Sequence, residues 1–185
     1  MHLFFNHISK AALCIFGVAL AWVCFFRLNS FIFSYLEETQ FINWIFIPSG
    51  IRLVSVLLLD ELAVAGLFIG AIITSPVFSI NMTETLVISL ISALNPYIAV
   101  HITKHLLKVD HILSQLRAKV LMLMAIFSAA FNTLSHHLYF HLVALKASWA
   151  NCVKMFVGDL VGIALTLVLF NIALKLIRRS TLANA

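Results

Sequence analysis

Long apolar runs separated by short polar segments make up most of the chain. The runs cover residues 8–26, 41–59, 62–78, 84–102, 119–140 and 155–177. Each is close to the ~20 residues that a helix needs to cross the hydrocarbon core of a bilayer. Because lipid leaves no water for unpaired backbone groups, we expect all six runs to be helical. The pattern predicts an all-α, polytopic transmembrane bundle of about six spans, forming one integral membrane domain over residues 1–185.

Composition supports a lipid environment. The chain is 63% hydrophobic and 10% charged, with a mean hydropathy of +1.08. Ordinary soluble domains contain roughly 45–50% apolar and about 25% charged residues. A soluble fold cannot hide this much apolar surface, so the lipid bilayer is the expected partner of most of the chain.

The net charge of +5 comes from basic residues at the ends of the apolar runs, not from one basic surface, so nucleic acid is not expected as a partner. Basic residues are enriched on the cytoplasmic side of membrane proteins. A cytoplasmic N-terminus places eight of them inside, namely Lys10, Lys104, Lys108, Arg117, Lys119, Lys175, Arg178 and Arg179, and three outside, namely Arg27, Lys146 and Lys154. The count predicts that both termini are cytoplasmic.

Arg52 lies in the middle of the second apolar run. A guanidinium at membrane depth needs a buried partner or a polar cavity, so Arg52 marks a candidate functional site. Pro48, Ser49 and Gly50 lie just before it. Pro48 has no amide proton and is expected to interrupt this span, whereas Gly50 allows another helix or a ligand to approach the backbone.

Asp159, near the start of the last run, is the acid considered for a position inside the membrane, and pairing with Arg52 would lower the cost of burying both charges. The sequence leaves open whether the two residues pair. Two interpretations remain open: a structural ion pair that fixes helix register, or a ligand site. Gly158 and Gly162 flank Asp159 and recur with Thr166 every four residues, which favours close helix packing on that face.

The fifth run carries the most polar helix face of the chain. Its polar residues are Ser128, Asn132, Ser135, His136 and Tyr139. The stripe predicts either hydrogen bonds between helices or the wall of a polar pocket, in which Asn132 and His136 would take part. In the fourth run, Asn95 precedes Pro96, and we expect a second break and a buried amide there.

No motif points to a metal, a cofactor or an enzyme. Three cysteines with no CxxC spacing are expected to be small core residues. Two histidine pairs lie one turn apart, His101 with His105 and His137 with His141, but at opposite ends of the predicted bundle. Neither pair completes a metal site without further ligands. Walker, GxSxG and HExxH motifs do not occur.

The segments Ile47-Pro48-Ser49-Gly50-Ile51 and Gly158-Asp159-Leu160-Val161-Gly162 resemble motifs of the membrane-associated sensor domains of the first class. These are polytopic bacterial modules, often fused to signalling domains, and they are related in architecture to the substrate-binding components of energy-coupling factor transporters. The resemblance implies a ligand-binding bundle in the bacterial inner membrane. It carries over Pro48, Gly50, Gly158, Asp159 and Gly162 as motif positions. The chain is shorter than that sensor region and contains no output domain.

Three functions follow as hypotheses. The first is a sensory or regulatory module that binds a small ligand or partner within the bundle and signals through a separate protein. The second is a small-solute transporter or its substrate-binding subunit. The third is a structural or assembly subunit of a larger membrane complex.

Overall fold

The computed structural model describes residues 2–39, 42–75, 81–108, 118–143 and 148–183. Six α-helices account for most of these residues, together with a short 3-10 helix and two very short strands. The elements in chain order are α1 (His2–Phe33), η1 (Ser34–Leu36), β1 (Glu37–Thr39), β2 (Ile42–Asn43), α2 (Pro48–Leu59), α3 (Glu61–Thr74), α4 (Met82–Leu107), α5 (Ala118–Leu142) and α6 (Trp149–Ala183). The expected helical bundle is confirmed at this level.

The six helices fall into two length classes. Four contain segments that are long and apolar enough to cross a membrane: Ser9–Leu36, Met82–Leu107, Ala118–Leu142 and Trp149–Ile177. Helices α2 and α3 have 12 and 14 residues. At 1.5 Å per residue they are about 18 and 21 Å long, less than the ~30 Å thickness of a hydrocarbon core.

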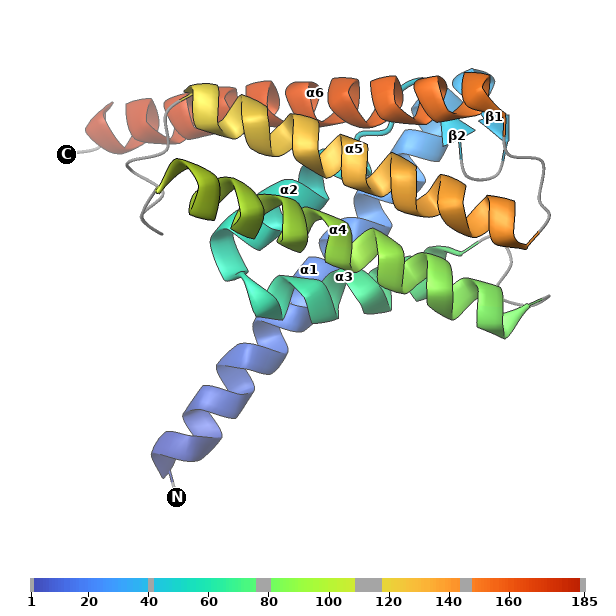
Figure 1. The fold of residues 1–185 in the computed structure, drawn as a ribbon. Coiled ribbons are helices and arrows are strands. Elements are labelled where there is room, and N and C mark those ends of the chain that lie inside the picture. Colours follow the sequence, from blue (N-terminus) through green and yellow to red (C-terminus); the bar gives the residue numbers. More distant parts are fainter. Residues whose placement is uncertain (1, 40–41, 76–80, 109–117, 144–147, 184–185) are drawn as a thin grey trace.

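Helix α2 lies at the centre of the bundle and packs against each of the other five helices. Figure 1 shows α4, α5 and α6 crossing the front of the molecule, with α1, α2 and α3 behind them. Helix α1 packs mainly on α3, and its N-terminal half projects away from the other helices. A short helix can be accommodated in such a bundle because its neighbours, not lipid, surround it.

The structure corrects two predictions about proline. The helix expected over 41–59 begins only at Pro48, the first residue of α2, where a missing amide proton costs no hydrogen bond. Pro48 therefore starts this helix and does not interrupt it. Helix α4 continues through Pro96 from Met82 to Leu107, so the break expected at Asn95 and Pro96 is absent.

Helices α2 and α3 are joined by a tight turn at Asp60. Asp60 separates α2 from α3 with a positive φ of 50°, which reverses the chain within one residue. Its amide donates a hydrogen bond to the Val56 carbonyl at 2.9 Å. The two short helices thus form a tight hairpin whose tip contacts α4, where the Tyr97 hydroxyl lies 3.5 Å from a Glu61 carboxylate oxygen.

Between α1 and α2 the chain forms a small cap that the hydrophobic pattern does not predict. Helix α1 extends to Phe33, beyond the expected end of the first span, and η1 follows directly. Strands β1 and β2 then pair antiparallel, with Glu37 opposite Asn43. An irregular segment over residues 44–47 then leads into α2.

Close packing of this segment on α6 depends on two glycines. A Cβ atom at Gly158 would collide with the backbone carbonyl oxygen of Asn43, and one at Gly162 with that of Phe46. The Phe46 amide also donates a hydrogen bond to the Gly158 carbonyl at 3.1 Å. The two glycines allow a close approach to α6, as predicted, but their partner is the non-helical backbone of residues 43–46 and not another helix.

Gly50 makes the matching approach from α2. A side chain at this position would overlap Thr166 on α6. The Thr166 hydroxyl bonds to the Ile47 carbonyl at 3.2 Å, just before α2 begins. Gly50 therefore admits a neighbouring helix, as predicted, and not a ligand.

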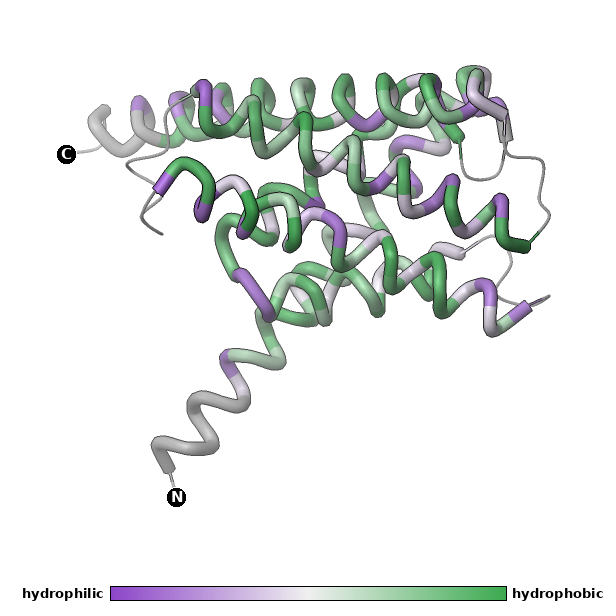
Figure 2. Tube along the Cα trace, viewed as in Figure 1, coloured by the Kyte–Doolittle hydropathy of each residue, from purple (hydrophilic) through white to green (hydrophobic). Residues whose placement is uncertain are grey.

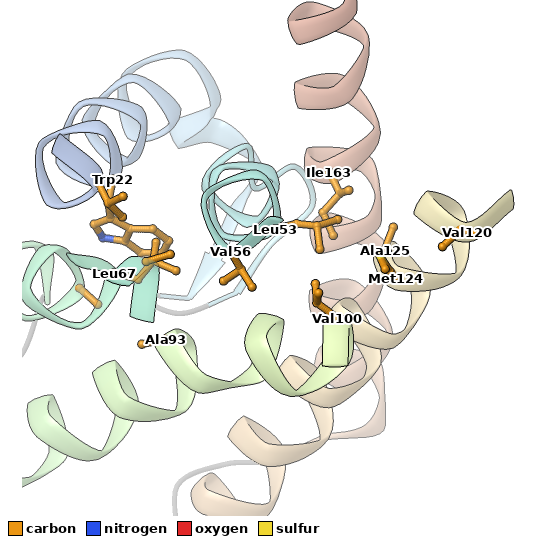
Figure 3. Packing of buried hydrophobic residues seen from close by; sticks show 13 residues of the cluster. Trp22, Leu53, Val56, Leu67, Ala93, Val100, Val120, Met124, Ala125 and Ile163 are labelled. Carbon is orange, nitrogen blue, oxygen red and sulfur yellow. The ribbon is translucent and has the colours of Figure 1, made fainter. Parts of the chain in front are cut away.

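A single apolar cluster holds the helices together. Figure 3 shows Leu53 of α2 facing Ile163 of α6, while Val56 lies beside Leu67 and Ala93. Figure 2 shows most of the helical trace as hydrophobic, with polar residues at helix ends and at a few internal positions. Those internal positions on α2, α5 and α6 form the site described next.

Candidate functional site: a buried ion pair beside a polar cavity

Arg52, Asn132 and Asp159 form a closed ring of hydrogen bonds between α2, α5 and α6. Arg52 Nη2 lies 2.9 Å from Asp159 Oδ1, and Arg52 Nη1 donates to Asn132 Oδ1 at 2.8 Å. Asn132 Nδ2 completes the ring by donating to Asp159 Oδ2 at 2.6 Å. Both carboxylate oxygens of Asp159 therefore accept hydrogen bonds, and the Asn132 amide takes part through its oxygen and its nitrogen.

The ring is shielded from solvent and lipid. The side chains of Arg52 and Asp159 are 3% and 2% exposed. The guanidinium carbon lies 5.8 Å from the ring centre of Trp22 and 5.6 Å from that of Phe46. Buried charges are tolerated only when they are paired and hydrogen bonded, and this arrangement supplies both conditions together with aromatic faces.

The backbone around the ring is fixed by hydrogen bonds between the same elements. The Ser49 hydroxyl donates to the Asp159 carbonyl at 2.8 Å, which ties the first turn of α2 to α6. Asn29, buried in α1, accepts a hydrogen bond from the Ile47 amide at 2.9 Å. These bonds hold Arg52 one turn further along α2, at the level of Asp159.

His136 extends the polar network from α5 to α4. Its Nδ1 lies 2.8 Å from the Asn132 carbonyl oxygen, which accepts only, so Nδ1 carries the proton. In the neutral ring Nε2 is then an acceptor, and the Ser92 hydroxyl lies 3.4 Å from it. A continuous polar chain therefore runs from Asp159 through Asn132 and His136 to Ser92.

A cavity of about 80 Å³ adjoins this network. It is large enough to hold more than one water molecule, since each needs at least about 10–15 Å³. Every helix contributes to its wall, and the cap between α1 and α2 forms its rim. The wall consists of Trp22, Phe26, Ser30, Glu37, Asn43, Phe46, Arg52, Ala71, Thr74, Ser75, Ile88, Ser89, Ser92, Asn132, His136, Met155 and Asp159.

One hydrogen-bond donor of the site has no partner among the described residues. This donor is the buried Nε atom of Arg52. An unpaired buried donor costs about 1–3 kcal/mol, and more when it is charged. Water or a small molecule in the adjoining cavity is the acceptor that such a group requires.

The predicted site residues divide into two groups. Arg52, Asn132, His136 and Asp159, from α2, α5 and α6, come together in the cavity wall. The other predicted residues serve in packing or lie elsewhere: Pro48, Ser49 and Gly50 at the start of α2, Gly158 and Gly162 beneath the cap, and Asn95, whose amide donates to Ser135 Oγ at 2.8 Å.

Several wall residues were not predicted. Trp22 and Thr74 are joined by a hydrogen bond of 2.8 Å between the indole nitrogen and the hydroxyl, in helices with no polar signal in their sequence. Ser89 and Ser92 are spaced i, i+3 within the apolar α4 run, and this spacing could have predicted a shared polar face of that helix. Glu37 lies in the cap, which the apolar pattern could not place.

The described residues contain no group of three His, Cys, Asp or Glu side chains that could hold a metal ion. His101 instead lies at the hairpin tip, with Nε2 3.4 Å from Asp60 Oδ1. His137 is close to the start of α6, where its Nε2 lies 3.0 Å from the Ser148 carbonyl oxygen.

The chain matches no family model, no curated protein and no solved structure.

Proposed function

We propose that the protein is a membrane-embedded sensory or regulatory module that binds a small polar molecule in the cavity beside Arg52. Occupancy of the cavity is read by a separate protein partner. The single observation that carries this proposal is the buried Arg52 guanidinium, which lines the cavity with Nε lacking a protein acceptor. The resemblance of the Pro48–Gly50 and Gly158–Gly162 segments to bacterial sensor motifs agrees with it.

The position of the cavity explains how binding would be transmitted. Its wall draws on all six helices, and the hydrogen-bonded ring within it connects α2, α5 and α6. A ligand shifts a conformational equilibrium only if it binds one arrangement better than another. A molecule that accepts a hydrogen bond from Arg52 would favour the packing in which these helices stay together.

For the topology we propose four membrane crossings by α1, α4, α5 and α6. The hairpin of α2 and α3 would enter and leave on one side, because each helix is shorter than a bilayer core. An even number of crossings keeps both termini on the same side, and the distribution of Lys and Arg favours the cytoplasm. We place the protein in the bacterial inner membrane.

Native mass spectrometry of protein released from its own membranes tests the proposal. We expect a small-molecule adduct on the wild type. Ala71→Leu, which fills the cavity from α3 without touching the ring, should remove the adduct. Ala164→Leu makes the same change on an exposed position of α6 and should retain it. A bare wild-type chain, or an adduct that survives Ala71→Leu, would refute the proposal.

The short hairpin supports a second candidate, a small-solute transporter or its substrate-binding subunit. Helices that do not cross the bilayer are common where transporters bind their cargo. Uptake of solute by liposomes containing only this protein would favour transport over sensing. A fixed complex with another membrane protein, unaffected by any small molecule, would instead favour a structural or assembly role.

A further inference from the structure

We infer that the cavity selects a small organic amine that also carries a hydrogen-bond acceptor oxygen, such as an amino alcohol. This inference rests on the proposed function and specifies the ligand class of the same site. It follows from the size of the cavity, the charges along its wall and the one donor without a partner.

Size limits the ligand first. An engineered apolar cavity of about 150 Å³ holds benzene, so about 80 Å³ is suited to a molecule of roughly three to five non-hydrogen atoms. The wall is also too polar for a hydrocarbon. The hydroxyls of Ser89 and Ser92 and the amide of Asn132 lie in it with the guanidinium of Arg52.

The charges of the wall disfavour an anion. When the His136 imidazole is uncharged, Arg52 supplies the only positive charge among the described wall residues. Asp159 neutralises this charge at a distance of 2.9 Å. Glu37, exposed at the rim, adds a negative charge. The nearby Lys154 does not compensate Glu37, since its Nζ lies 2.7 Å from the carboxylate of Glu38. The wall therefore carries a net charge of about −1, which attracts a cation.

The two ends of the site favour different groups on one ligand. Arg52 Nε needs an acceptor, and a hydroxyl oxygen provides one. Glu37, exposed at the rim, offers a carboxylate, and Phe26 in the wall offers an aromatic ring, and both groups are favourable to an ammonium group. Trp22 and Phe46 lie against the Arg52 guanidinium, and the third aromatic ring of the wall, Phe26, packs on both of them with ring centres 6.2 Å away. Phe26 is the ring that we assign to the ligand.

Fluorescence of Trp22 provides the readout. The chain has three tryptophans, and the other two, Trp44 and Trp149, are 41% and 85% exposed. In a Trp44→Phe, Trp149→Phe background, Trp22 in the cavity wall is the only tryptophan, and excitation at the red edge of the absorption band selects it over the three tyrosines. This protein, stripped of any bound molecule, is titrated at constant ionic strength with ethanolamine, ethylene glycol and acetate, which match in size and differ in charge.

We expect ethanolamine to bind about five- to tenfold more tightly than ethylene glycol, because its ammonium group gains one partly exposed ion pair and one cation–π contact. Acetate, which is an anion, should bind least. Glu37→Gln should remove the preference for ethanolamine over ethylene glycol. The matched Glu61→Gln, at an exposed position of the hairpin tip outside the cavity wall, should leave the preference intact.

Equal binding of the three probes, a preference for acetate, or an ethanolamine preference that survives Glu37→Gln would overturn this inference. If none of the probes binds while the native mass spectrum still shows an adduct lost in Ala71→Leu, the amine class is wrong and the cavity remains a ligand site. If none binds and the spectrum shows the bare chain, both proposals fail.

Discussion

Arg52 Nη2 and Asp159 Oδ1 lie 2.9 Å apart although 107 positions separate the two residues in the chain. Each group makes the burial of the other tolerable, and Asn132 bonds to both. The pair thereby fixes the register of α2 against α6 at the depth of the cavity. A structural ion pair and a ligand site are therefore not exclusive interpretations here, since the same guanidinium that holds the helices retains an unused donor.

Removal of either charge should destabilise the bundle strongly. Arg52→Ala or Asp159→Ala leaves an uncompensated buried charge, and we expect each to lower the free energy of unfolding by about 3–5 kcal/mol. The double variant should cost much less than the sum. Denaturant titrations in detergent, followed by circular dichroism, measure the cycle; additive losses would show that the two groups do not interact.

The exposed ion pair of the cap is the control for this cycle. Lys154 and Glu38 have side chains 20% and 43% exposed. Alanine at either position should cost no more than about 1 kcal/mol. Losses as large as those at Arg52 would mean that burial does not distinguish the two pairs.

Asn132 should matter through its bonds to both charged groups. Asn132→Ala removes a donor to Asp159 and an acceptor for Arg52, and we expect a loss of about 1.5–3 kcal/mol in the same titration. Asn171→Ala changes the same residue type at an exposed position of α6 and should be nearly neutral. Equal effects of the two substitutions would contradict the bridging role.

Gly162 and Gly17 form a matched pair for the packing of the cap. A Cβ at Gly162 meets the Phe46 carbonyl oxygen, whereas one at Gly17 meets nothing within 4 Å. Gly162→Ala should lower the free energy of unfolding by about 1–3 kcal/mol, because the backbone at Phe46 must move to make room for the methyl group. Gly17→Ala should be neutral or stabilising by about 0.5–1 kcal/mol through helix propensity. Thermal unfolding of the two variants side by side tests the contrast, and a neutral Gly162→Ala would rule out the close approach.

The helices and the two charged residues of the site could be predicted from the sequence because each has a strong local signal, whereas the pairing of Arg52 with Asp159 could not. Apolar runs near bilayer length marked the four long helices, and a charged residue within such a run marked Arg52. The polar stripe on the fifth run identified Asn132 and His136, which do meet Asp159 across helices. In each case an unpaired polar group in apolar surroundings costs so much free energy that the residue must find a polar partner inside the protein.

Other features depend on contacts that the apolar pattern does not encode. The run over 41–59 looks continuous, yet residues 42–47 are not helical, and the Phe46 amide bonds to the Gly158 carbonyl on α6 instead of to a helical partner. The two prolines expected to break helices do not do so: Pro48 forms part of the first turn of α2, and α4 continues through Pro96. Trp22 and Glu37 reach the cavity only through the tertiary fold.

Topology is open to a labelling test. We expect Ser148→Cys at the start of α6 to react with a membrane-impermeant thiol reagent added outside intact cells. Lys108→Cys, at the end of α4, should react only after the membrane is opened. The native cysteines Cys14, Cys24 and Cys152 are replaced beforehand. Reaction of Lys108→Cys in intact cells, with protection of Ser148→Cys, would reverse the proposed orientation.

The most direct test of the central claim is the Nε–H signal of Arg52 in an NMR spectrum of protein labelled with ¹⁵N-arginine. The chain has four other arginines, and the signal lost in Arg52→Lys identifies the one of interest. We predict slow exchange with water, and a shift of this signal when the bound molecule is removed. A signal that exchanges as fast as that of the exposed Arg27, and does not respond to removal, would contradict a sheltered guanidinium that binds a ligand.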